Sequence, residues 1–166
     1  EGYPRCGNTF AFYLIINIRN LDIAHHSHSL ANIKKGLKRN LPIIILIRNP
    51  YESIASNVLR KKEFNKNINL NLEINYQIEY YKIFYDYVNE FKNNLLIIDF
   101  KDLINTPKNF LEEVHNLLLK KDIGILSSEI ENMKINDFQN IENKAKLQIK
   151  KKEKLKNLSA KRMSIP

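Results

Sequence analysis

The residues from Gly2 to Thr9 have the types and spacing of a phosphate-binding loop. Gly2 and Gly7 match the G-x-x-x-x-G pattern, and the strongly apolar stretch from Phe10 to Ile18 follows as a predicted helix. Glycine lets a backbone approach an anion closely, successive N–H groups point at its oxygens, and the positive end of the following helix adds attraction. We therefore expect an anion site here, with a simple tight turn as the alternative.

Three side chains of this loop limit the chemistry that it can support. Asn8 stands where a nucleoside triphosphatase needs lysine, which disfavours ordinary ATP or GTP hydrolysis. Arg5 supplies a cation whose planar fork can grip a charged group. Cys6 is the only cysteine, and as a phosphatase nucleophile it would need an arginine six residues later, where Phe12 stands. We expect Cys6 to be a buried or loop-lining thiol.

A second anion site is predicted at Arg48. The continuous apolar run from Leu41 to Ile47 is typical of a strand covered on both faces, and Arg48 follows it directly. Ligands of open α/β sheets bind outside the carboxyl ends of the strands, which is where Arg48 would lie. A strand-end arginine held in an ion pair is the alternative.

The elements that must position these residues alternate between strands and helices. Leu95 to Phe100 reads as a second buried strand, and apolar residues at three- and four-residue spacing predict a helix from Leu72 to Phe91. Asn49-Pro50 and Thr106-Pro107 are helix-start signals. We predict an α/β fold with a P-loop-like, three-layer, doubly wound sheet, mostly parallel, with helices on both faces.

Charge and composition narrow the class of protein. Of the net charge of +9, an excess of +7 lies between Lys134 and Arg162, where ten Lys or Arg face three Asp or Glu. We expect a basic helical extension over residues 139–166 with a solvated face, and no nucleic-acid partner. No apolar stretch approaches the roughly 20 residues of a membrane helix, and with one cysteine and no recognisable leader we expect a cytoplasmic protein.

We expect residues 1–166 to form a single domain. Only Glu1 precedes Gly2, where a P-loop fold normally has a strand, and the chain stops abruptly at Pro166. These two features lead us to expect a domain that is truncated at both ends.

Three segments resemble the PAPS-dependent sulfotransferases, which use 3′-phosphoadenosine-5′-phosphosulfate (PAPS) as donor. Pro4 to Phe10 is similar to their 5′-phosphosulfate loop, P-[KR]-S-G-T-T-W, and Arg48 to Ser56 is similar to their 3′-phosphate site, in which a serine follows an arginine by eight residues. Asp99 to Leu103 is similar to their Y-E-D-L segment. The segments come in the family's order and extend from Gly2 to about Leu119.

The resemblance implies which residues bind the donor. Arg48 and Ser56 would hold the 3′-phosphate. The loop would bind the 5′-phosphosulfate through Arg5, Cys6, Gly7, Asn8 and Thr9, with Phe10 near the adenine. The sequence departs from the family pattern at four places: Cys6 for serine, Asn8 for threonine, Phe10 for tryptophan, and Phe100-Lys101 for Tyr-Glu.

A histidine segment, residues 25–29, holds three of the four histidines. Sulfuryl transfer to an alcohol needs a base for the hydroxyl proton, and histidine suits neutral pH. In the family the base lies in a K-T-H-L-P-like segment, to which His28 is the closest match and His26 the alternative. A zinc site or a merely polar loop are the other interpretations of this segment.

The sequence thus predicts a sulfotransferase that moves a sulfuryl group from PAPS to a hydroxyl or amine acceptor. His28 or His26 would be the base, Arg5 would stabilise the leaving phosphate, and no metal is expected. The acceptor would be a small molecule, a glycan or a lipid. A divergent P-loop kinase with Asp99 as magnesium ligand, and an inactive interaction module with this fold, are the alternatives.

Overall fold

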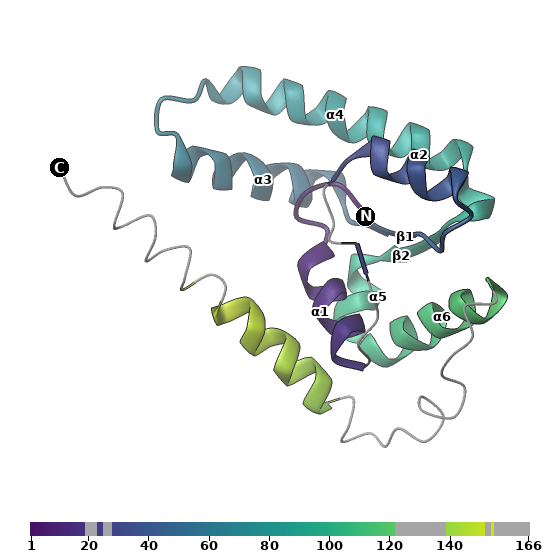
Figure 1. Ribbon diagram of the computed structural model, residues 1–166. Coiled ribbons are helices and arrows are strands. Elements are labelled where there is room, and N and C mark those ends of the chain that lie inside the picture. Colours follow the sequence, from purple (N-terminus) through teal and green to yellow (C-terminus); the bar gives the residue numbers. More distant parts are fainter. Residues whose placement is uncertain (19–22, 25–27, 122–138, 152–153, 155–166) are drawn as a thin grey trace.

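The computed structural model describes residues 1–18, 23–24, 28–121, 139–151 and 154 (Figure 1). In chain order these residues form α1 (Asn8–Ile18), α2 (Leu30–Lys38), β1 (Ile44–Ile47), α3 (Pro50–Phe64), α4 (Leu70–Glu90), the 3₁₀ turn η1 (Lys92–Asn94), β2 (Leu96–Asp99), α5 (Phe100–Asn105) and α6 (Pro107–Lys120). A further helix lies at residues 139–151. Within this described part, no helix combines the length and apolarity needed to cross a membrane.

The sheet is small and parallel. β1 pairs with β2 in a register that runs from Ile44 opposite Leu96 to Ile47 opposite Asp99. On the other edge of β1, Gly2 forms a parallel bridge with Leu46, and the Leu46 N–H donates to the Glu1 carbonyl at 2.9 Å. The fold is therefore mixed α/β with parallel pairing, and the loop leaves the sheet beside the carboxyl end of β1. With two strands and one bridge among the described residues, the larger doubly wound sheet is not confirmed.

Helices cover both faces of β1, because successive residues of this strand point to opposite faces. The buried apolar residues form two clusters. Ile45 packs in the smaller cluster with Ile33 of α2 and Phe84 of α4, whereas Leu46 packs in the larger cluster with Leu14 of α1 and Phe110 of α6. Figure 1 shows α2 and α4 on one side of the strands and α1 and α6 on the other. The continuous apolar run of β1 follows from this double burial.

Local signals in the sequence explain several helix boundaries. Asn49 caps α3 by accepting from the N–H groups of Tyr51 at 2.9 Å and Glu52 at 3.4 Å, and Pro50 is the first helical residue. α6 begins at Pro107, as expected, although its preceding Thr106 makes no side-chain cap. α4 begins two residues before the predicted start and ends one residue before the predicted end. α2 was not predicted.

The predicted basic extension is helical at residues 139–151, and its remaining residues, apart from 154, lie outside the described part of the chain. Two of its side chains, Ile141 and Ala145, are buried against the larger cluster. This helix therefore packs on the domain through its apolar positions. Its described lysines, such as Lys144 and Lys146, are exposed.

Candidate functional site

The loop from Gly2 to Asn8 has a backbone that only glycine fits at two positions. Gly7 has a φ of 85°, and a Cβ there would lie 2.9 Å from side-chain atoms of Leu103 and Phe100. A Cβ on Gly2 would lie 2.6 Å from the carbonyl oxygen of Leu46. Arg5 also has a positive φ, 72°. Such left-handed residues turn successive N–H groups into a concave, anion-attracting arrangement, and α1 begins directly after it at Asn8.

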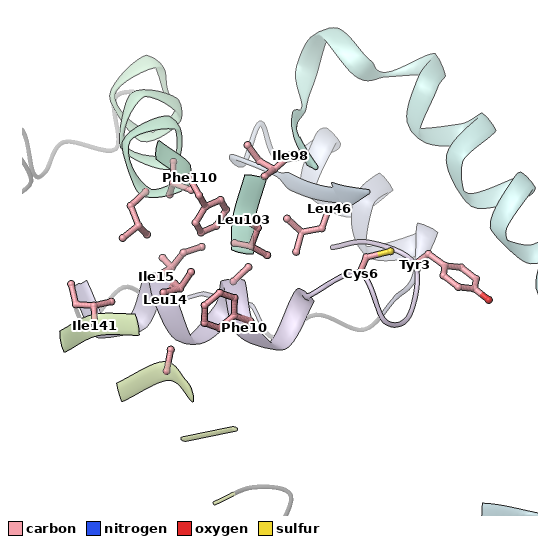
Figure 2. Close-up of a cluster of buried hydrophobic side chains, with 14 of the residues drawn as sticks. Tyr3, Cys6, Phe10, Leu14, Ile15, Leu46, Ile98, Leu103, Phe110 and Ile141 are labelled. Carbon is pink, nitrogen blue, oxygen red and sulfur yellow. The ribbon is translucent and has the colours of Figure 1, made fainter. Parts of the chain in front are cut away.

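Several side chains of the loop point inward, including three that the resemblance assigned to the donor. Cys6 has no exposed surface, Asn8 is 6% exposed and Phe10 is 8% exposed. The Asn8 amide donates to the carbonyl of Tyr3 at 3.1 Å, so it closes the loop from within. The Phe10 ring, on the first turn of α1, packs in the larger cluster (Figure 2), where the chain itself covers it. The side chains of these three residues are therefore turned away from a ligand, and the Cys6 N–H is also used within the loop, where it donates to the Tyr3 carbonyl at 3.3 Å.

Cys6 is a structural thiol. Burial raises its pKa to about 11, and its Sγ lies 3.5 Å from the Tyr85 hydroxyl. A thiol that stays protonated at neutral pH is a poor nucleophile. This environment agrees with the expectation of a buried thiol and argues against a phosphatase nucleophile.

Three of the other predicted residues meet on the exposed side of the loop. The Arg5 Nε donates to the Ser56 hydroxyl at 2.9 Å, and the Arg48 Nη1 donates to the Arg5 carbonyl at 3.0 Å. The loop, the carboxyl end of β1 and the second turn of α3 each contribute one of these residues. Thr9 lies in the first turn of α1 and is half-buried. The structure thus brings together residues that are 51 positions apart in the sequence.

Arg48 is held by two further side chains. Its guanidinium carbon lies 4.4 Å from the centre of the Phe100 ring, a cation–π contact that fixes one face of the group. Its Nη2 lies 3.0 Å from a carboxylate oxygen of Glu52, which is 53% exposed. The ion pair that we considered as an alternative therefore exists. Because Glu52 is exposed and one helical turn away, it can swing aside for a stronger anion.

His28 lies at the other end of the loop, against Gly2. Its Nδ1 is 2.7 Å from the Gly2 carbonyl, and its backbone N–H donates to a carboxylate oxygen of Glu1 at 2.9 Å. A carbonyl can only accept, so this contact favours the neutral tautomer with the proton on Nδ1, which leaves Nε2 as the basic nitrogen. His28 has a φ of 57°. The alternative base, His26, lies outside the described residues.

Sequence reasoning missed the tyrosines of α4 that tie these parts together. The Tyr81 hydroxyl donates to the Arg48 carbonyl at 2.8 Å, and the Tyr85 hydroxyl donates to the Leu46 carbonyl at 2.6 Å. The Tyr80 hydroxyl donates to the carbonyl of His28. Tyr81 and Tyr85 were recognised only as apolar positions of a helix face. Their spacing gave no sign that the hydroxyls would reach the backbone of the site.

A buried polar network connects the loop with the α3–α4 pair. The Tyr3 hydroxyl donates to the side-chain carbonyl of Gln77, which also accepts from the Asn57 amide at 2.9 Å. Gln77 in turn donates to Glu73 at 2.6 Å, and Glu73 pairs with Lys61 at 2.7 Å. Each member of this network has a hydrogen-bond partner, which is the condition for such a network to stabilise a fold. Elsewhere among the described residues, the buried Asn8 Oδ1 and His115 Nδ1 have none.

The described residues give no support to a metal centre. No three His, Cys, Asp or Glu side chains among them lie together as ligands. Asp99, the candidate magnesium ligand of the kinase alternative, accepts from the Lys101 N–H at 2.7 Å and caps α5. Its position is explained by that structural role.

The fold and site together define an α/β domain with an arginine-bearing loop at the carboxyl end of a parallel strand. No protein-family model, curated protein or solved structure matches the chain. Its function is therefore inferred from its own residues.

Proposed function

We propose that the chain binds PAPS and transfers its sulfuryl group to a hydroxyl or amine acceptor. The observation that carries this proposal is the meeting of Arg5, Arg48 and Ser56, with an Arg5–Ser56 hydrogen bond of 2.9 Å. Two arginines and a helix N-terminus at one sheet edge suit a ligand with more than one anionic group. A donor that carries both a 3′-phosphate and a 5′-phosphosulfate has that character.

In the proposed reaction the acceptor oxygen forms a bond to sulfur while the bond from sulfur to the 5′-phosphate oxygen breaks. The electron pair of the broken bond stays on the phosphate, and adenosine 3′,5′-bisphosphate leaves. His28 takes the hydroxyl proton on Nε2, the nitrogen that its contact with Gly2 leaves basic. Arg5 and the backbone N–H groups at the start of α1 stabilise the charge that builds on the leaving phosphate.

The binding part of the proposal extends to the 3′-phosphate. Arg48 and Ser56 would hold this group, and the Phe100 ring would keep the Arg48 guanidinium oriented. Glu52 would be displaced from its ion pair with Arg48 when the phosphate binds. Asn8 and Phe10 would contribute through their backbone N–H groups at the start of α1, and Cys6 through the shape of the loop.

The test is a calorimetric titration of the full chain with adenosine 3′,5′-bisphosphate and with ATP, both without magnesium. We expect the bisphosphate to bind and ATP to bind more weakly. Arg48→Ala should weaken bisphosphate binding about 10- to 100-fold, since a hydrogen bond to a charged group typically contributes about 1.5 to 3 kcal/mol. Arg60→Ala is the matched control, because Arg60 is an exposed arginine of α3 whose guanidinium lies 5.9 Å from the centre of the Phe64 ring.

Equal binding of the two nucleotides, or equal effects of the two arginine substitutions, would overturn the assignment. Binding of ATP that requires magnesium and depends on Asp99 would favour the kinase alternative. Bisphosphate binding without transfer of labelled sulfate to any hydroxyl or amine acceptor of a broad panel would favour an inactive domain that keeps the fold.

A further inference from the structure

Two neighbouring tyrosines of α4 contact the two halves of the site separately. Tyr81 donates to the carbonyl of Arg48 at 2.8 Å, and Tyr80 donates to the carbonyl of His28. Adjacent residues of a helix point about 100° apart, so one helix can reach two different segments in this way. Arg48 and His28 are 20 residues apart in the sequence. Arg48 directly follows β1, and His28 lies just before α2.

We propose that Tyr80 and Tyr81 are positioning residues. Tyr81 orients the arginine half of the site, which consists of Arg5, Arg48 and Ser56, and Tyr80 orients the histidine half, which is His28. This inference rests on the proposed function, because it assigns roles within the same site. Neither tyrosine needs to touch the donor. Each acts by fixing the backbone from which the functional side chain extends.

The arginine half depends on a short series of contacts. Tyr81 fixes the Arg48 carbonyl, Arg48 donates to the Arg5 carbonyl at 3.0 Å, and Arg5 donates to Ser56 at 2.9 Å. Burial raises the pKa of Tyr81 to about 12, so its hydroxyl remains a donor across the range in which the protein would work. Loss of this hydroxyl frees the end of β1 from which the guanidinium extends.

The histidine half depends on a backbone conformation that is rare outside glycine. His28 has a φ of 57°, and its N–H and C=O are fixed by Glu1 and Tyr80 respectively. Together these contacts keep Nδ1 2.7 Å from the Gly2 carbonyl. When the Tyr80 hydroxyl is removed, we expect the backbone to relax toward an ordinary φ and the ring to leave Gly2.

Three single substitutions separate the two roles: Tyr80→Phe, Tyr81→Phe and, as control, Tyr76→Phe. Tyr76 is on the same helix and is 60% exposed, and its contacts with Tyr80 and Lys61 involve the ring, which phenylalanine keeps. Two measurements are made on each full-length variant. One is bisphosphate affinity by calorimetry, and the other is the His28 tautomer by long-range ¹H–¹⁵N correlation spectra, assigned with His28→Gln.

We expect Tyr81→Phe to weaken bisphosphate binding about 3- to 10-fold, the range of one ordinary hydrogen bond, with the His28 tautomer unchanged. Tyr80→Phe should keep the affinity and shift His28 from the Nδ1–H tautomer toward Nε2–H. Tyr76→Phe should change neither. If Tyr81→Phe loses stability, 4-aminophenylalanine at this position restores a donor to the Arg48 carbonyl and should restore affinity.

The outcomes distinguish this inference from the proposed function. If the unmodified chain binds no bisphosphate, the proposed function fails and the role of Tyr81 fails with it, whereas the tautomer still decides the role of Tyr80. If the unmodified chain binds and Tyr81→Phe binds equally well, only the role of Tyr81 is overturned. An unchanged His28 tautomer in Tyr80→Phe overturns the role of Tyr80.

Discussion

The two faces of the Gly2 to Thr9 loop differ in almost every property. On the inward face, Tyr3 and Cys6 have no exposed surface and pack with the apolar residues of α1 and β1. On the outward face, Arg5 is exposed and joins Arg48 and Ser56. One short segment therefore serves both the stability of the fold and the candidate anion site. Substitutions should affect stability, binding or both, according to the face they alter.

The largest effect on stability and binding is expected at Gly7, whose backbone belongs to both faces of the loop. Gly7→Ala forces a side chain onto a φ of 85° and brings its Cβ to 2.9 Å from Leu103 and Phe100. Together the strain and overpacking should destabilise the fold by about 2 to 4 kcal/mol and also weaken bisphosphate binding. Urea unfolding and calorimetry measure the two effects.

Gly36→Ala is the matched control for this substitution. Its φ is not positive, its Cβ would meet the Ile43 side chain, at 2.8 Å from the terminal Cδ1 and 3.2 Å from Cγ1, and it lies within α2. We expect a change within about 1 kcal/mol and unaltered binding. Similar losses in both variants would show that the loop has no special requirement for glycine.

Alkaline pH should destabilise the inward face of the loop. Burial raises the pKa of Cys6 from 9.0 to about 11 and that of Tyr3 from 10.0 to about 12. Both groups then ionise more readily in the unfolded chain, so their stabilising contribution is complete below about pH 9 and is lost as pH rises toward 11 to 12. Each group accounts for about 2 to 3 kcal/mol at most.

Unfolding free energies measured at steps from pH 7 to pH 11 test this expectation. Cys6→Val removes the thiol that titrates first, so the decline between pH 9 and pH 10 should become shallower. A profile that stays flat up to pH 11, or one that Cys6→Val leaves unchanged, would mean that the loop's inward face is more open to water than its contacts indicate.

The smallest effect is expected on the outward face alone. Glu52→Gln removes the carboxylate that pairs with Arg48 at 3.0 Å, so a phosphate no longer competes with it. Exposed ion pairs are worth about 0.2 to 1 kcal/mol, which predicts about a 1.5- to 5-fold gain in bisphosphate affinity with stability nearly unchanged. Glu63→Gln, an exposed acid near the end of α3, controls for net charge. An equal gain in both variants would assign the effect to overall charge and not to the Arg48 pair.

Much of the fold was predictable because its signals are local. The cap at Asn49, the proline at 107 and the apolar run of β1 each depend on a few neighbouring residues, and the corresponding elements are present. The size of the sheet was not predictable in the same way, since it depends on which strands come together. The expectation of a larger doubly wound sheet came from the pattern of strands and helices, and the described residues form only two strands and one bridge.

The candidate site also has features that the sequence indicated and features that it did not. The resemblance assigned Arg5 to one anion site and Arg48 with Ser56 to a second one, and the structure brings the three residues into direct contact. Spacing did not indicate that Asn8 and Phe10 point inward, because the direction of their side chains depends on how α1 leaves the loop after the positive φ angle at Gly7. The tyrosine contacts of α4 were also hidden. A tyrosine on an apolar helix face has the same periodicity whether or not its hydroxyl finds a carbonyl.

The polar network between the loop and α4 has a consequence for the evolution of this chain. Tyr3 and Asn57 both donate to the side-chain carbonyl of Gln77 inside the protein, so replacing Gln77 leaves two buried donors without this acceptor. Drift at these three positions should therefore be correlated. Descendants that replace Gln77 would also replace Tyr3 and Asn57, for example by apolar residues of similar volume, whereas a change at Tyr3 or at Asn57 alone leaves the other residue bonded to Gln77.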